Sequence, residues 1–399
     1  MKRICKEIKY WSQLLLLPLY GLSFLVPRNK KIWVFGSSFG LRFADKPKSF
    51  YLYVSGKKPE GIRAVWITKR KEVLSFIREN DMEAYYLYSL KGLWYSLRAK
   101  IYLYDNYSKD ICYTLSGGAV KINLWHGIPL KKIQQDNMFD HFRNPRGLLE
   151  KLYAIPRRLS DEKPSNYVLS ASQYYIDVFA SAFRTQKVLV AGYPRNDILI
   201  DDNFKLVLSE ADTKAVEKLQ QIEGNRIVLY MPTFRDSETM FFEIMDLQNF
   251  CSFLESKEIT FCVKLHPKSK LQAEFAKLDN KNLVVADPMG DPYPLCRMAD
   301  LLVTDYSSIY FDYLMTGKPM VFFPYDYDEY LGSSRELYFD YEEFTPGIKV
   351  RNMEELKAAL TGQDGYSAAR QKLKKKLFTD NMDSGSKQLF EKVFDIINP

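Results

Sequence analysis

Short apolar runs alternate with longer amphipathic segments along most of the chain. In the first half, the apolar runs predict strands within residues 31–37, 63–69, 100–105 and 121–127. The amphipathic segments predict helices within residues 48–56, 71–80 and 90–99. Because the runs are apolar throughout, both faces of the strands are expected to be covered, as in a parallel sheet.

The second half repeats this pattern. Its predicted strands lie within residues 225–233, 259–267, 282–287, 299–308 and 318–326. At 399 residues the chain exceeds the size at which one hydrophobic core stops growing, so two domains are expected. The predicted fold class is therefore α/β, with two units in succession.

The boundary between the units is expected at the turn-rich segment Gly192–Asp197. The predicted parts are an N-terminal segment of residues 1–29, an α/β domain of residues 30–196 and a second α/β domain of residues 197–399. The amphipathic stretch 386–398 follows the last predicted strand, and we expect it to form a helix that crosses back to the first domain.

The composition narrows the class of protein. With 46% hydrophobic, 15% aromatic and 27% charged residues and no low-complexity tract, the chain is typical of an ordered globular protein. The five cysteines form no CxxC pair, which argues against a zinc site or a disulfide framework and favours a reducing compartment. The aromatic residues lie inside predicted elements and do not alternate with lysines, so no nucleic acid partner is expected.

Most of the net charge of +8 belongs to the N-terminus, since residues 1–31 hold seven Lys or Arg and a single Glu. Between these charges, the apolar stretch 10–26 would reach only about 25 Å as a helix, which is marginal for spanning a bilayer. We expect it to lie in the cytoplasmic leaflet, held by apolar insertion and by attraction to anionic lipid. An ordinary buried first helix is the alternative.

Polar residues follow four of the predicted strands, where ligands of open parallel sheets bind. His126 and Gly127 follow the first of these strands, Thr233 and Arg235 the second, and His266 the third, while Asp305, Ser307 and Ser308 follow the fourth. Two of the three histidines thus end strands in different halves, which predicts that they face each other across an interdomain cleft.

The last of these strand ends has features of a phosphate site. Ser307 and Ser308 open a predicted helix that ends at Gly317, and exposed N–H groups with the helix dipole attract phosphate oxygens. A simple helix cap is an equally good explanation. Lys264 and Lys268 beside His266 favour contact with an anion, and together these residues indicate a phosphate-bearing donor. An imidazole, with its ordinary pKa near 6.5, suits general-base catalysis on a hydroxyl.

Other motifs that would indicate a cofactor are absent from the sequence. It has no GxGxxG fingerprint or P-loop, no HExxH or carboxylate-rich metal cluster and no GxSxG elbow. We therefore expect no dinucleotide, no metal site and no other cofactor.

The ordered series LWHGIPLKKI, GYPRND, LYMPTFRD, VKLHP and ADLLVTDYSSIYFDYLMTGKPMVFFPYDYDEY resembles the CDP-glycerol glycerophosphotransferase family, which builds wall teichoic acid and some capsules. The match runs from about Lys30 to Ile397. The resemblance implies two Rossmann-like domains in a GT-B-type glycosyltransferase architecture, with the donor nucleotide in the C-terminal domain. It also implies an acceptor linked to undecaprenyl diphosphate.

The resemblance further implies the roles of individual residues. His126 would take the proton from the acceptor hydroxyl, and His266 would contact the donor diphosphate. Ser308 and Asp312 match the family's positions for the phosphate and the nucleotide. The other expected substrate contacts are Gly127, Lys131, Thr233, Arg235, Lys264, Asp305 and Ser307.

The implied reaction transfers glycerol phosphate from CDP-glycerol to a hydroxyl of a lipid-linked saccharide or polyol-phosphate acceptor and releases CMP. It would take place at the cytoplasmic face of the cell membrane, in teichoic acid or capsule biosynthesis. The family usually has Thr where this chain has Ile128, so CDP-ribitol as donor and a nucleotide-sugar glycosyltransferase of the same fold stay open. Primase and polymerase activity also stay open.

Residues 139–159 mix aromatic residues, leucines and arginines. This pattern predicts a second membrane contact, with a solvated helical loop that buries an apolar stripe as the alternative.

Overall fold

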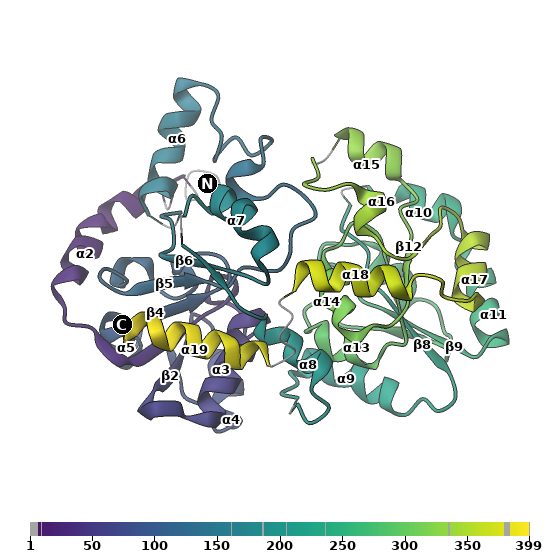
Figure 1. The fold of residues 1–399 in the computed structure, drawn as a ribbon, viewed down its shortest axis with the longest axis horizontal. Helices are drawn as coiled ribbons and strands as arrows, with labels where there is room; N and C mark the ends of the chain where they lie inside the picture. Colours follow the sequence, from purple (N-terminus) through teal and green to yellow (C-terminus); the bar gives the residue numbers. More distant parts are fainter. Residues whose placement is uncertain are drawn as a thin grey trace. The chain divides into compact units, whose positions relative to one another are not determined.

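The computed structural model describes residues 7, 8, 10–160, 162–185, 187–204, 206–235, 237–333, 336–378 and 384–398. Two compact units form within these residues (Figure 1). The first comprises the chain up to His126, Ile133–Asp197 and the residues from Leu377 on, and the second comprises Gly127–Lys132 and Ile198–Lys376. The chain therefore enters the second unit briefly after His126, and its C-terminal end belongs to the first.

The first unit is built on a seven-stranded parallel sheet with the order β3-β2-β1-β4-β5-β6-β7. Its strands are β1 (Asn29–Phe35), β2 (Arg63–Thr68), β3 (Ala84–Tyr86), β4 (Ala99–Tyr104), β5 (Val120–Asn123), β6 (Tyr167–Ser170) and β7 (Val188–Val190). Its main helices are α2 (Leu17–Leu22), α3 (Asp45–Lys57), α4 (Lys71–Glu79), α5 (Leu90–Arg98), α6 (Leu148–Leu159), α7 (Ile176–Phe183) and α19 (Gly385–Ile397).

The second unit has a six-stranded parallel sheet with the order β10-β9-β8-β11-β12-β13. Its strands are β8 (Arg226–Tyr230), β9 (Ile259–Val263), β10 (Leu283–Val285), β11 (Leu301–Thr304), β12 (Met320–Phe322) and β13 (Ile348–Lys349). Its helices are α8 (Asp197–Ile200), α9 (Glu210–Gln220), α10 (Thr239–Ile244), α11 (Leu247–Ser256), α12 (Leu271–Ala276), α13 (Tyr293–Met298), α14 (Ile309–Tyr313), α15 (Tyr327–Ser333), α16 (Tyr341–Phe344), α17 (Met353–Thr361) and α18 (Ser367–Leu377).

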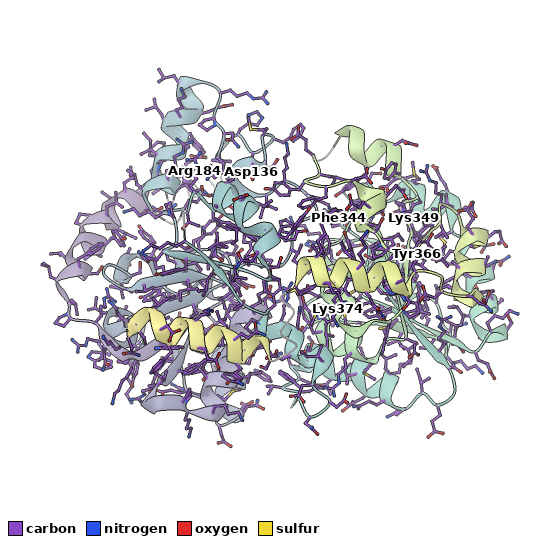
Figure 2. All side chains as sticks on the ribbon, viewed as in Figure 1. Asp136, Arg184, Phe344, Lys349, Tyr366 and Lys374 are labelled. Atoms are coloured by element: carbon purple, nitrogen blue, oxygen red, sulfur yellow. The ribbon has the colours of Figure 1, made fainter. Side chains whose placement is uncertain are left out.

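Both sheets are buried by helices on their faces, and side chains fill the space between the layers (Figure 2). The burial explains the continuous apolar runs: Trp33, Val34 and Phe35 in β1 and all of β9 are inaccessible or nearly so. In the second unit Lys374 of α18 donates through Nζ to the carbonyl of Met315 at 3.1 Å, in the short helix η10 (Leu314–Thr316) that follows α14. The prediction of two parallel α/β units is confirmed.

The N-terminal segment is a chain of short helical pieces, η1 (Ser12–Leu16), α2 and η2 (Ser23–Leu25). Five of their seven leucines are exposed, with Leu15 and Leu25 each 78% accessible, so the alternative of a buried first helix is wrong. No helix in the described part of the chain is long and apolar enough to cross a membrane. Lys2, Arg3, Lys6 and Lys9, whose charge entered the membrane prediction, lie outside the described residues.

Arg28 fixes this segment to the first sheet. Its guanidinium donates to five backbone carbonyls, which belong to Ser23, Ser96, Ala99, Leu115 and Gly117. Since these carbonyls come from η2, from the end of α5 and from the turn before β5, one side chain joins three parts of the unit.

Asp197 joins the end of the first unit to the start of α19. Its carboxylate accepts from Ser384 Oγ at 2.7 Å, Gly385 N at 2.6 Å and Ser386 N at 3.1 Å. An anion at a helix N-terminus is stabilised by the free N–H groups and by the helix dipole. The approach is close enough that a Cβ on Gly385 would lie 2.6 Å from the Tyr193 carbonyl oxygen.

We expect Asp197→Ala to lower the free energy of unfolding by about 2 kcal/mol or more, because buried hydrogen bonds to a charged group are lost. Protection of α19 amides in hydrogen exchange should fall more than that of the β4 strand. Asp395→Ala, on the exposed side of the same helix, is the matched control and should change neither. Equal protection of α19 in Asp197→Ala and the wild type would contradict the assigned role.

Candidate active site

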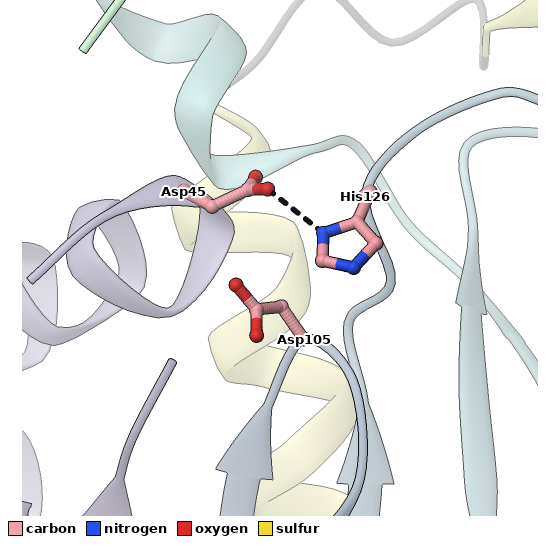
Figure 3. Close-up of side chains that lie close together, drawn as sticks. All are labelled: Asp45, Asp105 and His126. Atoms are coloured by element: carbon pink, nitrogen blue, oxygen red, sulfur yellow. Dashed lines mark hydrogen bonds and ion pairs between the residues drawn. The ribbon is translucent and has the colours of Figure 1, made fainter. Parts of the chain in front are cut away.

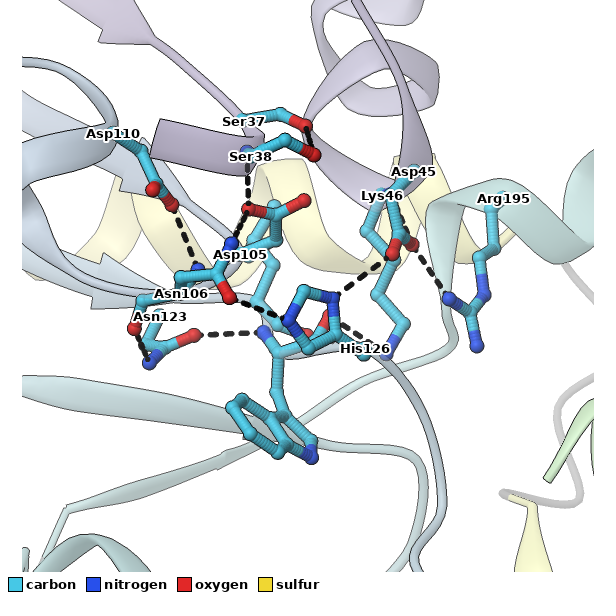
Figure 4. Close-up of polar contacts among 12 residues, drawn as sticks. Ser37, Ser38, Asp45, Lys46, Asp105, Asn106, Asp110, Asn123, His126 and Arg195 are labelled. Atoms are coloured by element: carbon cyan, nitrogen blue, oxygen red, sulfur yellow. Dashed lines mark hydrogen bonds and ion pairs between the residues drawn. The ribbon is translucent and has the colours of Figure 1, made fainter. Parts of the chain in front are cut away.

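The carboxyl ends of three neighbouring strands meet at one edge of the first sheet. The segment after β1 contributes Ser38, the segment after β4 contributes Asp105 and Asn106, and the segment after β5 contributes His126 (Figure 4). Asp105 Oδ1 accepts from Ser38 N at 3.0 Å and from Asn106 Nδ2 at 2.9 Å. Parallel pairing of β1, β4 and β5 therefore brings residues far apart in sequence to one place.

Both ring nitrogens of His126 face acceptor groups. Nδ1 lies 3.2 Å from Asp45 Oδ2, and Nε2 lies 2.8 Å from Asn106 Oδ1. The Asn106 amide is oriented by its Nδ2, which donates to Asp105, so its oxygen is the atom turned to the imidazole. The ring itself is half-exposed. It can thus be held by two partners and still be reached by a substrate.

Asp45 opens α3 in a left-handed backbone conformation, with φ of +61°. Its Oδ1 accepts from Arg195 Nη1 at 2.5 Å and from Lys46 N at 2.7 Å, while Oδ2 faces His126. Burial alone would raise the pKa of Asp45, but Arg195, His126 and Lys46 outweigh it and hold that pKa well below its usual range. Asp45 is therefore an ionised acceptor.

Lys46, the next residue, holds the backbone that precedes His126. Its side chain is inaccessible to solvent, and Nζ lies 3.2 Å from the Leu124 carbonyl and 3.3 Å from that of Trp125. The ammonium also lies 3.3 Å from the centre of the Tyr193 ring. Trp125 has φ of +52°, an uncommon conformation that this anchoring stabilises.

Asp45, Asp105 and His126 have the composition of a cation site, since one ligand atom of each lies within 4.8 Å of the others (Figure 3). Asp45 already pairs with Arg195, so a cation would have to compete with that guanidinium for the carboxylate. Burial and then the neighbouring Asp105 raise the pKa of the nearby Asp110 well above its usual range.

In the second unit, the strand ends of β8 and β9 line a pocket. The lining residues are Pro232, Thr233, Phe234, Arg235, Glu238, Leu265, His266, Ser269, Leu271 and Tyr325. The ring of His266 lies 5.0 Å from that of Phe234, and its Nδ1 accepts from Lys268 N at 3.2 Å. Partial burial, with a smaller effect of Lys268, lowers the pKa of His266 from its usual value. The neutral ring therefore carries its proton on Nε2.

Arg235 lines this pocket, but its guanidinium is tied to two carboxylates. It lies 2.6 Å from Asp305 and 2.8 Å from Asp326, and its side chain is 8% exposed. Asp305 also accepts from Thr233 N at 2.8 Å. These contacts join the strand ends of β8, β11 and β12, so they organise the loops around the pocket.

Four of the expected substrate contacts, Lys264, Ser307, Ser308 and Asp312, are not among the residues that line this pocket. Lys264 is buried, and its Nζ donates to the Asp287 carbonyl. Ser307 and Ser308 are partly exposed before α14, a helix of five residues, and the Ser308 side chain makes no capping hydrogen bond. Asp312 is buried and accepts from Tyr293 Oη at 3.0 Å.

The segment after His126 pairs with the second unit. Lys131 forms an antiparallel bridge with Leu337, and its Nζ donates to Tyr330 Oη. Gly127 has φ of +144°, which glycine tolerates best, and Ile128 is 1% exposed. The Lys131 ammonium therefore already has a hydrogen-bond partner in Tyr330, and the Ile128 side chain is buried.

Sequence reasoning did not assign a role to the partners that hold His126, which are Asp45, Lys46, Asn106 and Arg195. Two signals were present: Asp105 and Asn106 follow a predicted strand directly, and Arg195 lies in the GYPRND motif. Asp45 gave no signal, because nothing local distinguishes it from other acidic residues before a helix.

Comparison with known proteins places these features in a family. The model of CDP-glycerol:poly(glycerophosphate) glycerophosphotransferases matches residues 19–395. A teichoic acid poly(glycerol phosphate) polymerase from Bacillus spizizenii is 29% identical, over 90% of this chain and 91% of that protein. A polymerase of the same name from Staphylococcus epidermidis is 30% identical over 79% of this chain, which covers 43% of that longer protein.

A solved structure of the wall teichoic acid polymerase TagF superposes with a TM-score of 0.72 at 21% identity, covering 100% of this chain and 98% of that one, and so supports the fold. The family match extends over nearly the whole chain, including both histidine-bearing strand ends. The chain belongs to the CDP-glycerol:poly(glycerophosphate) glycerophosphotransferase family.

Proposed function

We propose that the chain transfers glycerol phosphate from CDP-glycerol to a hydroxyl of a lipid-linked acceptor in teichoic acid synthesis, with His126 as the general base. The observation that supports this most is the strand-end imidazole of His126, held by Asp45 and Asn106 and still half-exposed. Family membership supplies the donor and the class of reaction.

In the proposed reaction, the acceptor oxygen attacks the phosphorus that bears the glycerol. The new P–O bond forms as the bond to the CMP phosphate oxygen breaks, and the hydroxyl proton passes to His126. The leaving CMP takes the bonding electron pair, and negative charge spreads over the phosphoryl oxygens. Positioning and fixed dipoles supply most of the catalysis in reactions of this kind.

His266 is proposed to bind the donor diphosphate through Nε2–H. The backbone N–H of Lys268 occupies Nδ1, so Nε2 is the nitrogen left to donate. Ser307 and Ser308 would add hydroxyl donors for the phosphates, Lys264 a positive charge and Asp312 a contact to the nucleotide. Thr233, Arg235 and Asp305 would shape the same region through their mutual contacts, and Gly127 and Lys131 would act on the acceptor side.

A membrane surface is the proposed location of the acceptor. Exposed apolar side chains gather on two segments of the first unit, which we call the apolar face: Leu15, Leu19, Leu22, Phe24, Leu25, Phe139, Phe142, Leu148, Leu149 and Leu152. The segments touch, since Tyr10 stacks on Tyr153 of α6 at 4.9 Å and Ser160 Oγ donates to Gln13.

Exposed basic side chains accompany α6, namely Arg146, Lys151 and Arg158. Apolar insertion with nearby positive charge suits an anionic lipid surface. We therefore propose peripheral attachment to the cytoplasmic face of the membrane, where an undecaprenyl-diphosphate-linked acceptor would be available.

The reaction is tested by CMP release from CDP-glycerol with a synthetic lipid-linked disaccharide, followed by the mass of the product. We expect His126→Ala and His266→Ala each to lower the rate by about 10²-fold or more, the usual scale for a general base or an oriented donor. His141→Ala, at an exposed histidine, is the matched control. Turnover of UDP-sugars or CDP-ribitol with none of CDP-glycerol would overturn the proposed donor.

The protonation of His266 is tested by NMR with ¹⁵N-labelled histidine, for which the chain has only three residues. We expect the midpoint of His266 below the usual 6.5, because burial and Lys268 lower its pKa. Lys268→Ala removes a positive charge and should raise the midpoint, while Lys270→Ala, a nearby lysine, should not. A wild-type midpoint at or above 6.5 would show that the ring is not desolvated as described.

Attachment to the membrane is tested by sedimentation with vesicles that contain phosphatidylglycerol. The double variant Leu148→Ser/Leu149→Ser should bind about 10²-fold more weakly or weaker still, since each fully buried leucine contributes about 1.5–3 kcal/mol and about 1.4 kcal/mol is a factor of ten. Phe242→Ser, at an exposed apolar residue of the second unit, should bind as the wild type does. Equal binding of all three proteins would refute a role for the apolar face.

A further inference from the structure

We propose that Asp45, clamped by Arg195, is a positioning residue that keeps a proton on His126 Nδ1 and leaves Nε2 to receive the proton of the acceptor hydroxyl. The proposal rests on the proposed function only for the role of His126 as base. Its structural part, the choice of nitrogen, can be measured without turnover.

The first step is the direction of the hydrogen bond between Asp45 and His126. An ionised carboxylate can only accept, so the 3.2 Å contact requires a proton on Nδ1. Arg195 Nη1 and the Lys46 backbone N–H both occupy Oδ1, which leaves Oδ2 for the imidazole. The Arg195 side chain is 6% exposed, and pairing with a buried guanidinium maintains the charge on Asp45.

The second step concerns the other ring nitrogen. Nε2 lies 2.8 Å from Asn106 Oδ1, so the contacts at the two ring nitrogens can both be hydrogen bonds only when the ring carries two protons, as it does after proton transfer. When the ring carries a single proton, the carboxylate of Asp45 is a stronger acceptor than the amide oxygen of Asn106, so the proton stays on Nδ1. Nε2 then has the lone pair that accepts the hydroxyl proton, and Nε2–H donates to Asn106 once it has done so.

The third step concerns the backbone. Asp45 and Trp125 both have positive φ, at +61° and +52°, in residues without the freedom of glycine. Arg195 holds the first position through the Asp45 carboxylate, and Lys46 holds the second through the Trp125 carbonyl. Strained residues that persist around one imidazole are consistent with a ring whose orientation is important for catalysis.

The direct test is the tautomer of His126 in the full chain, read from ¹⁵N shifts of labelled histidine at a pH where the ring is neutral, with His126→Gln to assign the signal. In the wild type we expect the proton on Nδ1. In Asp45→Asn, Arg195 should hold the new amide oxygen, so the NH₂ group faces Nδ1 and the proton moves to Nε2. Asn also tolerates positive φ, so the start of α3 is preserved.

The kinetic consequence should be selective. We expect Asp45→Asn to lower kcat by about 10²-fold or more and to change KM for CDP-glycerol less than about threefold, because the wrong tautomer affects proton transfer but not donor binding. Glu83→Gln, which neutralises a carboxylate paired with Arg63 in the same unit, is the matched control and should retain kcat and the His126 signal.

If Asp45→Asn does not fold, Arg195→Met tests the same proposal, because it removes the guanidinium that clamps Asp45 and keeps Asp45 itself. For this variant we expect a lower kcat and a smaller share of the Nδ1 tautomer. An unchanged tautomer and unchanged kcat in the folded variant would overturn the proposal. If His126→Gln is inactive while Asp45→Asn is fully active, only this inference fails. If the wild type releases no CMP from CDP-glycerol, the proposed function fails, and the tautomer comparison still decides the role of Asp45.

Discussion

The ion pair between Arg195 and Asp45 is the interaction on which the arrangement of the first unit's strand-end residues depends. The two residues are 150 positions apart, one at the start of α3 and the other just before the chain enters the second unit. Because Asp45 also contacts His126, the ion pair links Gly192–Asp197, the segment that contains Arg195, to the proposed base. Arg195 is buried and Asp45 partly buried, and a pair of this kind is costly to form and more costly to break at one partner, which makes it better suited to fixing geometry than to adding stability.

The GYPRND motif extends this connection to the C-terminal helix. The Tyr193 ring covers the Lys46 ammonium, Arg195 binds Asp45, and Asp197 caps α19. One short segment therefore supports the residues around His126 and also ties down the end of the chain. The segment directly precedes Ile198, where the second unit begins again, so the chain is held in the first unit by three side chains just before it leaves that unit.

The sequence was sufficient to predict much of the fold, because a strand buried on both faces must be apolar throughout, as in 31–37 and 259–267. It was not sufficient for β3 and β7, the two edge strands of the first sheet, because two of the three residues in each are only partly buried and the need for a run of buried apolar residues is weaker there. The positions of His126 and His266 at strand ends were predictable, since parallel strands direct ligand contacts to that edge. The partners of His126 were not, because Asp45 and Arg195 meet only in the folded chain. Arg235, which looked like an anion contact in sequence, has two carboxylate partners that no local pattern indicated.

The two strand-end histidines differ in the nitrogen that the protein occupies, and this difference separates their chemistry. At His126, Nδ1 faces an ionised carboxylate, so it must donate, and Nε2 is the nitrogen with a lone pair. At His266, Nδ1 faces a backbone N–H, so it must accept, and Nε2 carries the hydrogen. The first arrangement suits the proposed base, and the second suits the proposed neutral hydrogen-bond donor to a diphosphate. In each ring the group at Nδ1 favours one tautomer, and at His126 the Asn106 oxygen, 2.8 Å from Nε2, becomes the acceptor once Nε2 is protonated.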